Sequence, residues 1–124
     1  MSSVGVCGMI NKYFSRDEFA CKCGCGFSAV DVDLLAVLTD VRGHFDKAVK
    51  INSACRCPAH NKAVGGEDKS MHMFGMAADF VVVGVSPAKV YQYLTGLYPT
   101  TYGLGLYKTW VHLDVRRAPA RWEK

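Results

Sequence analysis

The chain has 124 residues, a length that fits one domain with a core of its own. Half of the residues are hydrophobic, but no apolar run reaches the roughly 18 residues that a membrane span needs. The formal net charge of +4 could favour an anionic polymer, either a cell wall or a nucleic acid. No basic motif interleaved with aromatic residues supports nucleic-acid binding, so the basic C-terminal residues are expected to form a solvated tail: Arg116, Arg117, Arg121 and Lys124.

The N-terminal residues lack hydrophobic periodicity, so we expect an irregular arm over residues 1–12 and a single domain over residues 13–124. No basic segment precedes a sustained apolar run, which predicts synthesis in the cytoplasm without a secretory signal. Ser15 and Glu18 have the spacing of a capping box and predict a short helix.

Six cysteines are many for a cytoplasmic protein: Cys7, Cys21, Cys23, Cys25, Cys55 and Cys57. Reduced thiols are the default expectation in a reducing compartment, and disulfides are an alternative. A structural zinc ion is a further alternative, provided that the segments 21–25 and 55–57 meet in the fold. It is the least favoured of the three, because the usual Cys-x2-Cys spacing is absent.

The middle of the chain alternates helical and extended patterns. Leu34, Leu38, Val41 and Phe45 recur at helical spacing, which predicts a helix that closes at Gly43. Further segments predict a short strand (49–52), a helix (58–64), a buried central strand (80–83), a helix after Ser86-Pro87, and a β-hairpin running from the glycines at 103 and 105 into the segment around residue 112. This order of elements predicts an α+β domain with a small, mostly antiparallel sheet.

The segment 70–79 contains His72 and Asp79, an imidazole and a carboxylate that suit zinc. His112 is the natural third ligand, and it alternates with apolar residues in a strand pattern that places it on one face with Asp114. A single histidine in a small domain is more often an ordinary surface or core residue, so residue types alone leave both interpretations open. Burial of Asp79 beside an apolar strand favours a bound cation, because an unpaired buried carboxylate is costly.

The ordered motifs decide between these interpretations. Ser70, His72, Gly75, Ala77 and Asp79, preceded by Arg56 in Ser-Ala-Cys-Arg-Cys-Pro and followed by His112 in Val-His-Leu-Asp-Val-Arg, resemble the zinc D-alanyl-D-alanine peptidase family, peptidase M15. The resemblance runs from Tyr13 to the C-terminus. It implies a small sheet flanked by helices, as in DD-peptidases and hedgehog domains. It also implies a catalytic zinc ion held by His72, Asp79 and His112, with Arg56 and Ser70 binding substrate.

The sequence departs from many relatives in one respect that bears on catalysis. Thr109 stands three residues before the last histidine, where an acidic residue is common, so proton transfer has to come from elsewhere. Asp114 is the candidate for that role, or for orienting His112 as a neighbouring partner. Glu67 and Asp68 are alternatives.

The resemblance therefore predicts a monomeric zinc metallopeptidase that hydrolyses peptidoglycan stem peptides, as a D-Ala-D-Ala carboxypeptidase or an endopeptidase. The family includes phage endolysins, and a compact domain of this kind fits a lysin that acts on the cell wall after release. Neither nucleic acid nor membrane is an expected partner. The alternative is a non-catalytic, zinc-containing peptidoglycan-binding module of the same fold, as hedgehog domains suggest.

Overall fold

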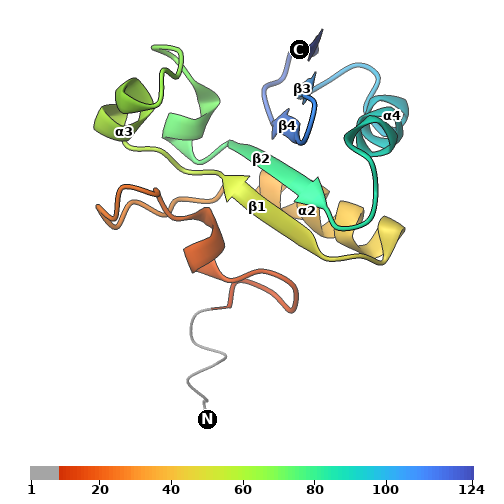
Figure 1. The fold of residues 1–124 in the computed structure, drawn as a ribbon, viewed down its shortest axis with the longest axis horizontal. Helices are drawn as coiled ribbons and strands as arrows, with labels where there is room; N and C mark the ends of the chain where they lie inside the picture. Colours follow the sequence, from red (N-terminus) through yellow and green to blue (C-terminus); the bar gives the residue numbers. More distant parts are fainter. Residues whose placement is uncertain (1–8) are drawn as a thin grey trace.

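A computed structural model describes residues 9–124 (Figure 1). The expected arm over residues 1–12 therefore lies mostly outside the described residues. In chain order the elements are η1 (Arg16–Phe19), α2 (Val32–Phe45), β1 (Val49–Ser53), α3 (Pro58–Ala63), η2 (Met71–Phe74), β2 (Ala77–Val82), α4 (Pro87–Leu97), β3 (Gly103–Leu106), β4 (Val111–Asp114) and β5 (Ala120–Glu123).

The helices begin where the sequence signals place them. The carboxylate of Asp31 accepts hydrogen bonds from two backbone N–H groups at the start of α2, and the hydroxyl of Ser86 accepts one, from Lys89, at the start of α4. The predicted end of α2 at Gly43 is wrong, because the helix continues to Phe45. Asp46 ends it in the left-handed conformation, with its N–H bonded to the carbonyl of Arg42.

The sheet has the strand order β1-β2-β4-β3-β5 and is mixed rather than mostly antiparallel. The first three neighbouring pairs are antiparallel and include the predicted hairpin of β3 and β4, but β5 pairs parallel with β3. Sequence patterns did not predict β5, because four residues at the end of the chain carry too little periodic signal. The expected α+β class is confirmed. The prediction of a mostly antiparallel sheet is wrong, because the sheet is mixed.

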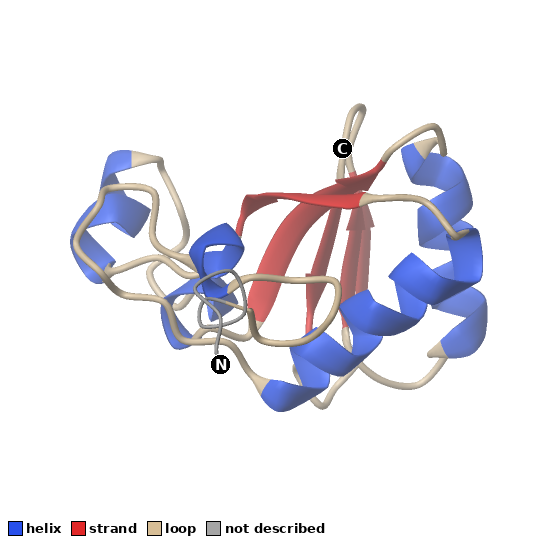
Figure 2. Ribbon diagram, turned by 90° about the horizontal axis from the view of Figure 1, so that it is seen from below, coloured by secondary structure: helices blue, strands red, loops and turns tan. Residues whose placement is uncertain are grey.

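Helices α2 and α4 pack against the sheet and leave its opposite face for other groups (Figure 2). The core between them contains Phe80 from β2, Leu104 from β3 and Leu113 from β4, all fully buried. Side chains of successive strand residues point to opposite faces. Asp79, His112 and Asp114 therefore lie on the face away from this core.

Strand β2 differs from its prediction in a way that matters for the site. It begins at Ala77, so Asp79 lies inside the strand and not at its head, while Val83 lies outside it and is exposed. Asp79 is thereby fixed by ladder pairing on both sides, to Ser53 of β1 and to His112 of β4. No helix within residues 9–124 combines the length and the apolar character that a membrane crossing requires.

Candidate metal centre

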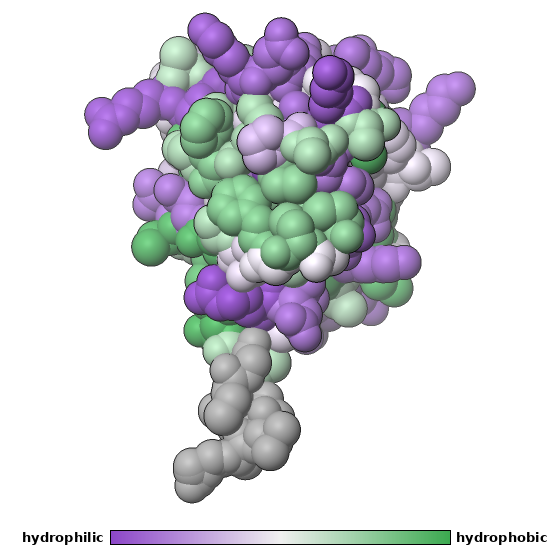
Figure 3. All heavy atoms as spheres, turned by 90° about the vertical axis from the view of Figure 1, so that its left-hand side faces the viewer, coloured by the Kyte–Doolittle hydropathy of each residue, from purple (hydrophilic) through white to green (hydrophobic). Residues whose placement is uncertain are grey.

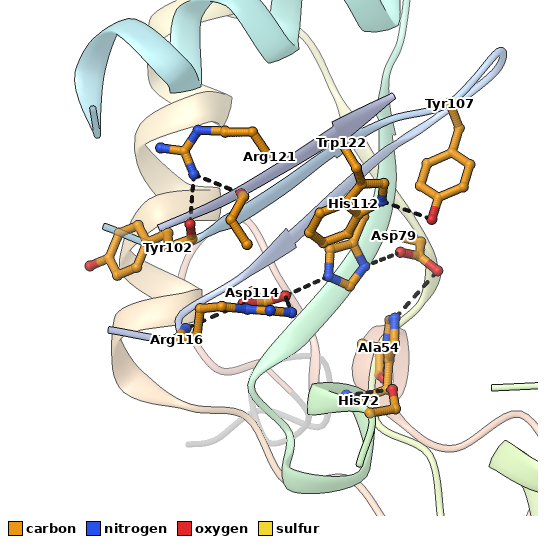
Figure 4. Close-up of polar contacts among 12 residues, drawn as sticks. Ala54, His72, Asp79, Tyr102, Tyr107, His112, Asp114, Arg116, Arg121 and Trp122 are labelled. Carbon is orange, nitrogen blue, oxygen red and sulfur yellow. Dashed lines mark hydrogen bonds and ion pairs between the residues drawn. The ribbon is translucent and has the colours of Figure 1, made fainter. Parts of the chain in front are cut away.

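Three separate elements bring His72, Asp79 and His112 together. His72 comes from η2, while Asp79 and His112 are direct cross-strand partners on β2 and β4. Gly75 ends η2 with a φ of 69°, a left-handed conformation that turns the chain back toward β2. Figure 4 shows His112 between the carboxylates of Asp79 and Asp114, with His72 on the other side of Asp79.

The ring of His72 is oriented by the backbone. Its Nδ1 lies 2.6 Å from the carbonyl oxygen of Ala54, and because a carbonyl only accepts, Nδ1 carries the proton. In the neutral ring, Nε2 then keeps its lone pair and faces Asp79 Oδ2 at 3.4 Å. Ser70 caps η2 by accepting the N–H of His72, and the N–H of Arg56 donates to the carbonyl of His72. Ser70 therefore caps η2 in this structure, and its expected role in substrate binding stays a prediction.

His112 is held between two carboxylates. Its Nδ1 lies 2.8 Å from Asp79 Oδ1, and its Nε2 lies 2.8 Å from Asp114 Oδ2. Burial lowers the pKa of His112, but hydrogen bonds to Asp114 and Asp79 outweigh it and raise the pKa above its usual value. A proton on Nε2 that is donated to Asp114 leaves Nδ1 as the atom that can bind a metal.

Asp114 has no exposed surface, and its four hydrogen bonds use both oxygens. Arg116 forks onto it, with Nε 2.7 Å from Oδ1 and Nη2 2.7 Å from Oδ2, and the backbone N–H of Arg116 also donates to Oδ1. Burial raises the pKa of Asp114, but the hydrogen bonds from His112 and Arg116 hold it well below the usual range. Asp114 is therefore a buried carboxylate that points His112 toward Asp79.

Asp79 is the second carboxylate with a lowered pKa in the cluster. Burial raises the pKa of Asp79, but the neighbouring imidazoles of His112 and His72 bring it well below its normal value. Arg56 lies beside it, with Nη2 3.5 Å from Asp79 Oδ2. Asn61, which is buried, accepts a bond from Arg56 Nη1 and donates to the carbonyl of Glu67. Asn61 thus ties the Arg56 loop to the loop that precedes Ser70.

The donor atoms fit a single divalent ion. One atom from each of His72, Asp79 and His112 lies within 4.8 Å of the others. A tetrahedral ion with bonds of about 2.1 Å holds its ligand atoms about 3.4 Å apart. His72 Nε2 lies 3.4 Å from Asp79 Oδ2 and His112 Nδ1 lies 2.8 Å from Asp79 Oδ1, so each imidazole is close to one oxygen of the carboxylate at a separation near that value. Two neutral imidazoles and one carboxylate are a donor set that suits zinc.

Two glycines of β3 make room for the groups around His112. Gly105 is paired with His112 on one side and Trp122 on the other, and a Cβ there would lie 2.3 Å from Trp122 Nε1. The indole therefore crosses over the glycine, and its ring centroid lies 5.1 Å from that of His112. Gly103 likewise leaves room for the pair of Asp114 and Arg116, because a Cβ at this position would lie 2.5 Å from both carboxylate oxygens of Asp114.

The expectation of a solvated basic tail is wrong for Arg116 and Arg121. Arg116 pairs with Asp114, and Arg121 donates to backbone carbonyls of Tyr102 and Thr101. The sequence also gave no functional indication for Asn61 or Trp122. An arginine two residues after an aspartate on a strand is a usable signal for such a pair, because alternate residues share a face.

Comparison with known protein families shows which family the chain belongs to. A model of the peptidase M15 family matches residues 12–114, which include Arg56 and all three candidate ligands. The chain belongs to the peptidase M15 family. This M15 protein is accordingly a metallopeptidase by family, and the matched region ends at Asp114, the carboxylate that orients His112. No curated protein matches the chain.

Proposed function

We propose that this M15 peptidase is a zinc enzyme that hydrolyses peptide bonds in peptidoglycan stem peptides. The observation that supports it is the convergence of His72 Nε2, an Asp79 oxygen and His112 Nδ1 on one point of the sheet face away from α2 and α4. When bound, zinc supplies Lewis-acid polarisation of a carbonyl group and activation of water. The fold that we propose to underlie this activity is the DD-peptidase type, which hedgehog domains share.

The protein groups around the ion have separate tasks in this proposal. The carbonyl of Ala54 fixes the tautomer of His72, and Asp114 fixes that of His112, so both present a lone pair to the metal. Asp79 contributes the negative charge. Asp114 is a positioning residue, because Arg116 and His112 leave it no free hydrogen-bonding site for substrate or water.

Proton transfer then has to come from another group, and Glu67 is the better of the two alternatives. Its carbonyl is held by Asn61 Nδ2 at 2.8 Å, next to the Arg56 loop. The pKa of Arg116 is raised mainly by its bond to Asp114, and the charge of Glu67 adds to this effect, so we propose that the exposed carboxylate of Glu67 reaches the site. A carboxylate in this position can accept a proton from water and deliver it to the leaving amine.

Arg56 is proposed to bind a carboxylate of the wall peptide. Its guanidinium is largely buried, with Nε on Ser53 and Nη1 on Asn61, so its direction is fixed. Its remaining contact is Asp79, 3.5 Å away. A metal ion that takes up the charge of Asp79 would leave Nη2 available for a substrate carboxylate beside the scissile bond.

The decisive experiment combines metal analysis with a turbidity assay on exposed bacterial cell walls. We expect His72→Ala and His112→Ala to lose the zinc of this centre and all lytic activity, and chelator to abolish the activity of the parent protein. His44→Ala is the matched control, because His44 is exposed on α2 and lies outside the cluster. Full activity in either ligand variant would exclude this centre.

The same preparation separates the remaining alternatives. Zinc bound to the three ligands without release of wall fragments would indicate the non-catalytic binding module. If fragments are released, their masses distinguish removal of a terminal D-alanine from cleavage inside the stem peptide. We favour a phage-type lysin that reaches the wall after release, and lysis of walls added from outside is the activity expected of it.

Arg56→Ala tests the carboxylate-binding role. We expect kcat/KM to fall by about 10- to 100-fold, since one charge-assisted pair to substrate is worth about 1.5–3 kcal/mol. Arg56→Lys should recover only part of this loss, because an ammonium group cannot fork onto a carboxylate. Normal kcat/KM in Arg56→Ala would refute the assignment.

A further inference from the structure

Four cysteines from two distant segments meet near the N-terminal end of α3. Cys21, Cys23 and Cys25 come from the loop after η1, and Cys57 is the residue that caps α3. The loop after η1, orange in Figure 1, lies next to α3. Cys23 Sγ lies 3.4 Å from Cys21 Sγ and 3.6 Å from Cys57 Sγ, and all four sulfur atoms lie within 4.8 Å of one another.

This spacing suits one tetrahedral ion. Zinc–sulfur bonds of about 2.3 Å place the four sulfur atoms of a tetrathiolate site about 3.8 Å apart. The two measured sulfur contacts are close to that edge length and much longer than the roughly 2.05 Å of a disulfide bond. All five cysteines of the described part of the chain are free thiols. Cys55 is buried and is not one of the four.

The tight Cys-x-Cys-x-Cys spacing works because the loop is not extended. Gly24 has a φ of +84°, and its N–H bonds to the carbonyl of Cys21, which closes a turn inside the motif. The N–H of Cys21 bonds to the carbonyl of Phe27, so the loop returns to its start. In a straight strand the three cysteines would share one face, but Cys21 and Cys25 would lie about 13 Å apart along it, too far to bind one ion. The turn shortens these separations, because all four sulfur atoms lie within 4.8 Å of one another, and it thus removes the objection that the spacing raised.

Backbone donors already point at the sulfur atoms. The N–H of Cys57 donates to Cys21 Sγ at 3.4 Å, and the N–H of His60 donates to Cys57 Sγ at the same distance. Hydrogen bonds to sulfur favour the thiolate, which is the form that binds metal. Cys23 and Cys25 are exposed, whereas Cys21 is buried. On this side of the molecule, hydrophobic atoms gather in the middle of a hydrophilic surround (Figure 3).

We propose that Cys21, Cys23, Cys25 and Cys57 bind a second zinc ion with a structural role, separate from the centre at His72. Each thiol that binds releases its proton to solvent, so the site is filled more completely as the pH rises. Four protein ligands leave no open position, which distinguishes this site from a catalytic one.

The second ion would fix the loop that serves the first centre. Residues 54–57 carry the carbonyl that orients His72, the guanidinium beside Asp79, and the thiol that joins the cysteine cluster. Apart from the short η1, no helix or strand covers residues 9–31, so the loop that holds three of the thiols belongs to no regular element. A zinc ion that joins this loop to Cys57 would therefore hold Arg56 in place.

Zinc content of the full chain tests the proposal. We expect two zinc ions per chain in the parent protein, one in Cys23→Ser and one in His72→Ala. Cys55→Ala is the matched control and should keep both, because Cys55 lies outside the cluster. The two sites fail independently: loss of the His72 zinc alone would leave the cysteine site intact, and the reverse also holds. One zinc ion in the parent protein, lost in His72→Ala, would overturn the second site.

Cobalt substitution of the parent protein provides a measurement that does not depend on folding of a variant. A tetrathiolate cobalt site gives strong sulfur-to-metal charge-transfer absorption in the near ultraviolet, which a site of two imidazoles and a carboxylate does not give. We expect this absorption in the parent protein and in His72→Ala. Its absence, iron in place of zinc, or disulfides among these four cysteines in the freshly purified protein would refute the proposal.

Discussion

Asp114→Asn tests the positioning role most sharply, because it keeps the size of the side chain and removes its charge. Asp114 Oδ2 faces His112 Nε2 and Arg116 Nη2, while Oδ1 accepts from Arg116 Nε and the backbone N–H of Arg116. An asparagine has one oxygen for these four partners, and its NH2 group donates. In either orientation of the amide, two donors lose their acceptor.

Both orientations have a predictable cost. If the NH2 group faces His112, the imidazole has to present a lone pair on Nε2, and the proton then moves to Nδ1, the atom that binds the metal. If the NH2 group faces Arg116 Nε, the forked contact between residue 114 and the Arg116 guanidinium is broken. With charge-assisted hydrogen bonds worth about 1.5–3 kcal/mol, we expect the metal-free protein to lose about 3 kcal/mol of unfolding free energy. Zinc affinity should fall by about 10- to 100-fold, as for other partners of metal-binding histidines.

Denaturant unfolding of the metal-free protein measures the first effect, and competition with a chromophoric chelator measures the second. Asp68→Asn is the control, since Asp68 is an exposed aspartate in the loop before Ser70. Turnover is then compared at zinc concentrations that saturate both proteins, where most of the activity should return. Unchanged zinc affinity together with a collapse of turnover in the zinc-saturated variant would refute the positioning role and make Asp114 the proton-transfer group.

Three further predictions concern neighbouring groups. Gly105→Ala places a Cβ 2.3 Å from Trp122 Nε1, so we expect about 1–3 kcal/mol of lost unfolding free energy and a perturbed His112 in NMR spectra; native stability would contradict the close packing. Glu67→Gln should lower kcat by about 10²- to 10⁴-fold with zinc retained, whereas Asp68→Asn should not; equal kcat in both would exclude Glu67. The raised pKa of His112 means that protons compete with zinc for its ring nitrogen. The zinc affinity of the His72 centre should therefore increase as the pH rises through that pKa. A zinc affinity that does not change with pH in chelator competition would argue against His112 as a ligand.

Local signals in the sequence were sufficient for most elements of the fold. The cap at Ser86 with Pro87 and the capping box at Ser15 act within four residues, so each could be recognised without knowledge of the rest of the chain. The hairpin into β4 was predictable for the same reason. The parallel addition of β5 was not, because the residues that it pairs with belong to β3, on the other side of β4 in the chain.

The candidate centre was predictable as a set of residues, but its internal arrangement was not. His72, Asp79 and His112 could be selected from residue chemistry and an ordered motif, and the structure places their donor atoms together. Arg116 donates hydrogen bonds to both oxygens of Asp114 and so leaves them no free position. This contact depends on how far the arginine side chain reaches across the pleat of the folded strand.

The sequence by itself determined which side chains can bind metal and where helices start, because both depend on residue type and on neighbours a few positions away. Only the tertiary structure decided that Cys57 lies beside Cys23, 34 residues earlier, and that Trp122 crosses Gly105 to reach His112. Contacts of this kind form when the whole core packs. Their free energy comes from burial shared by many residues, and no single segment carries a signal for it.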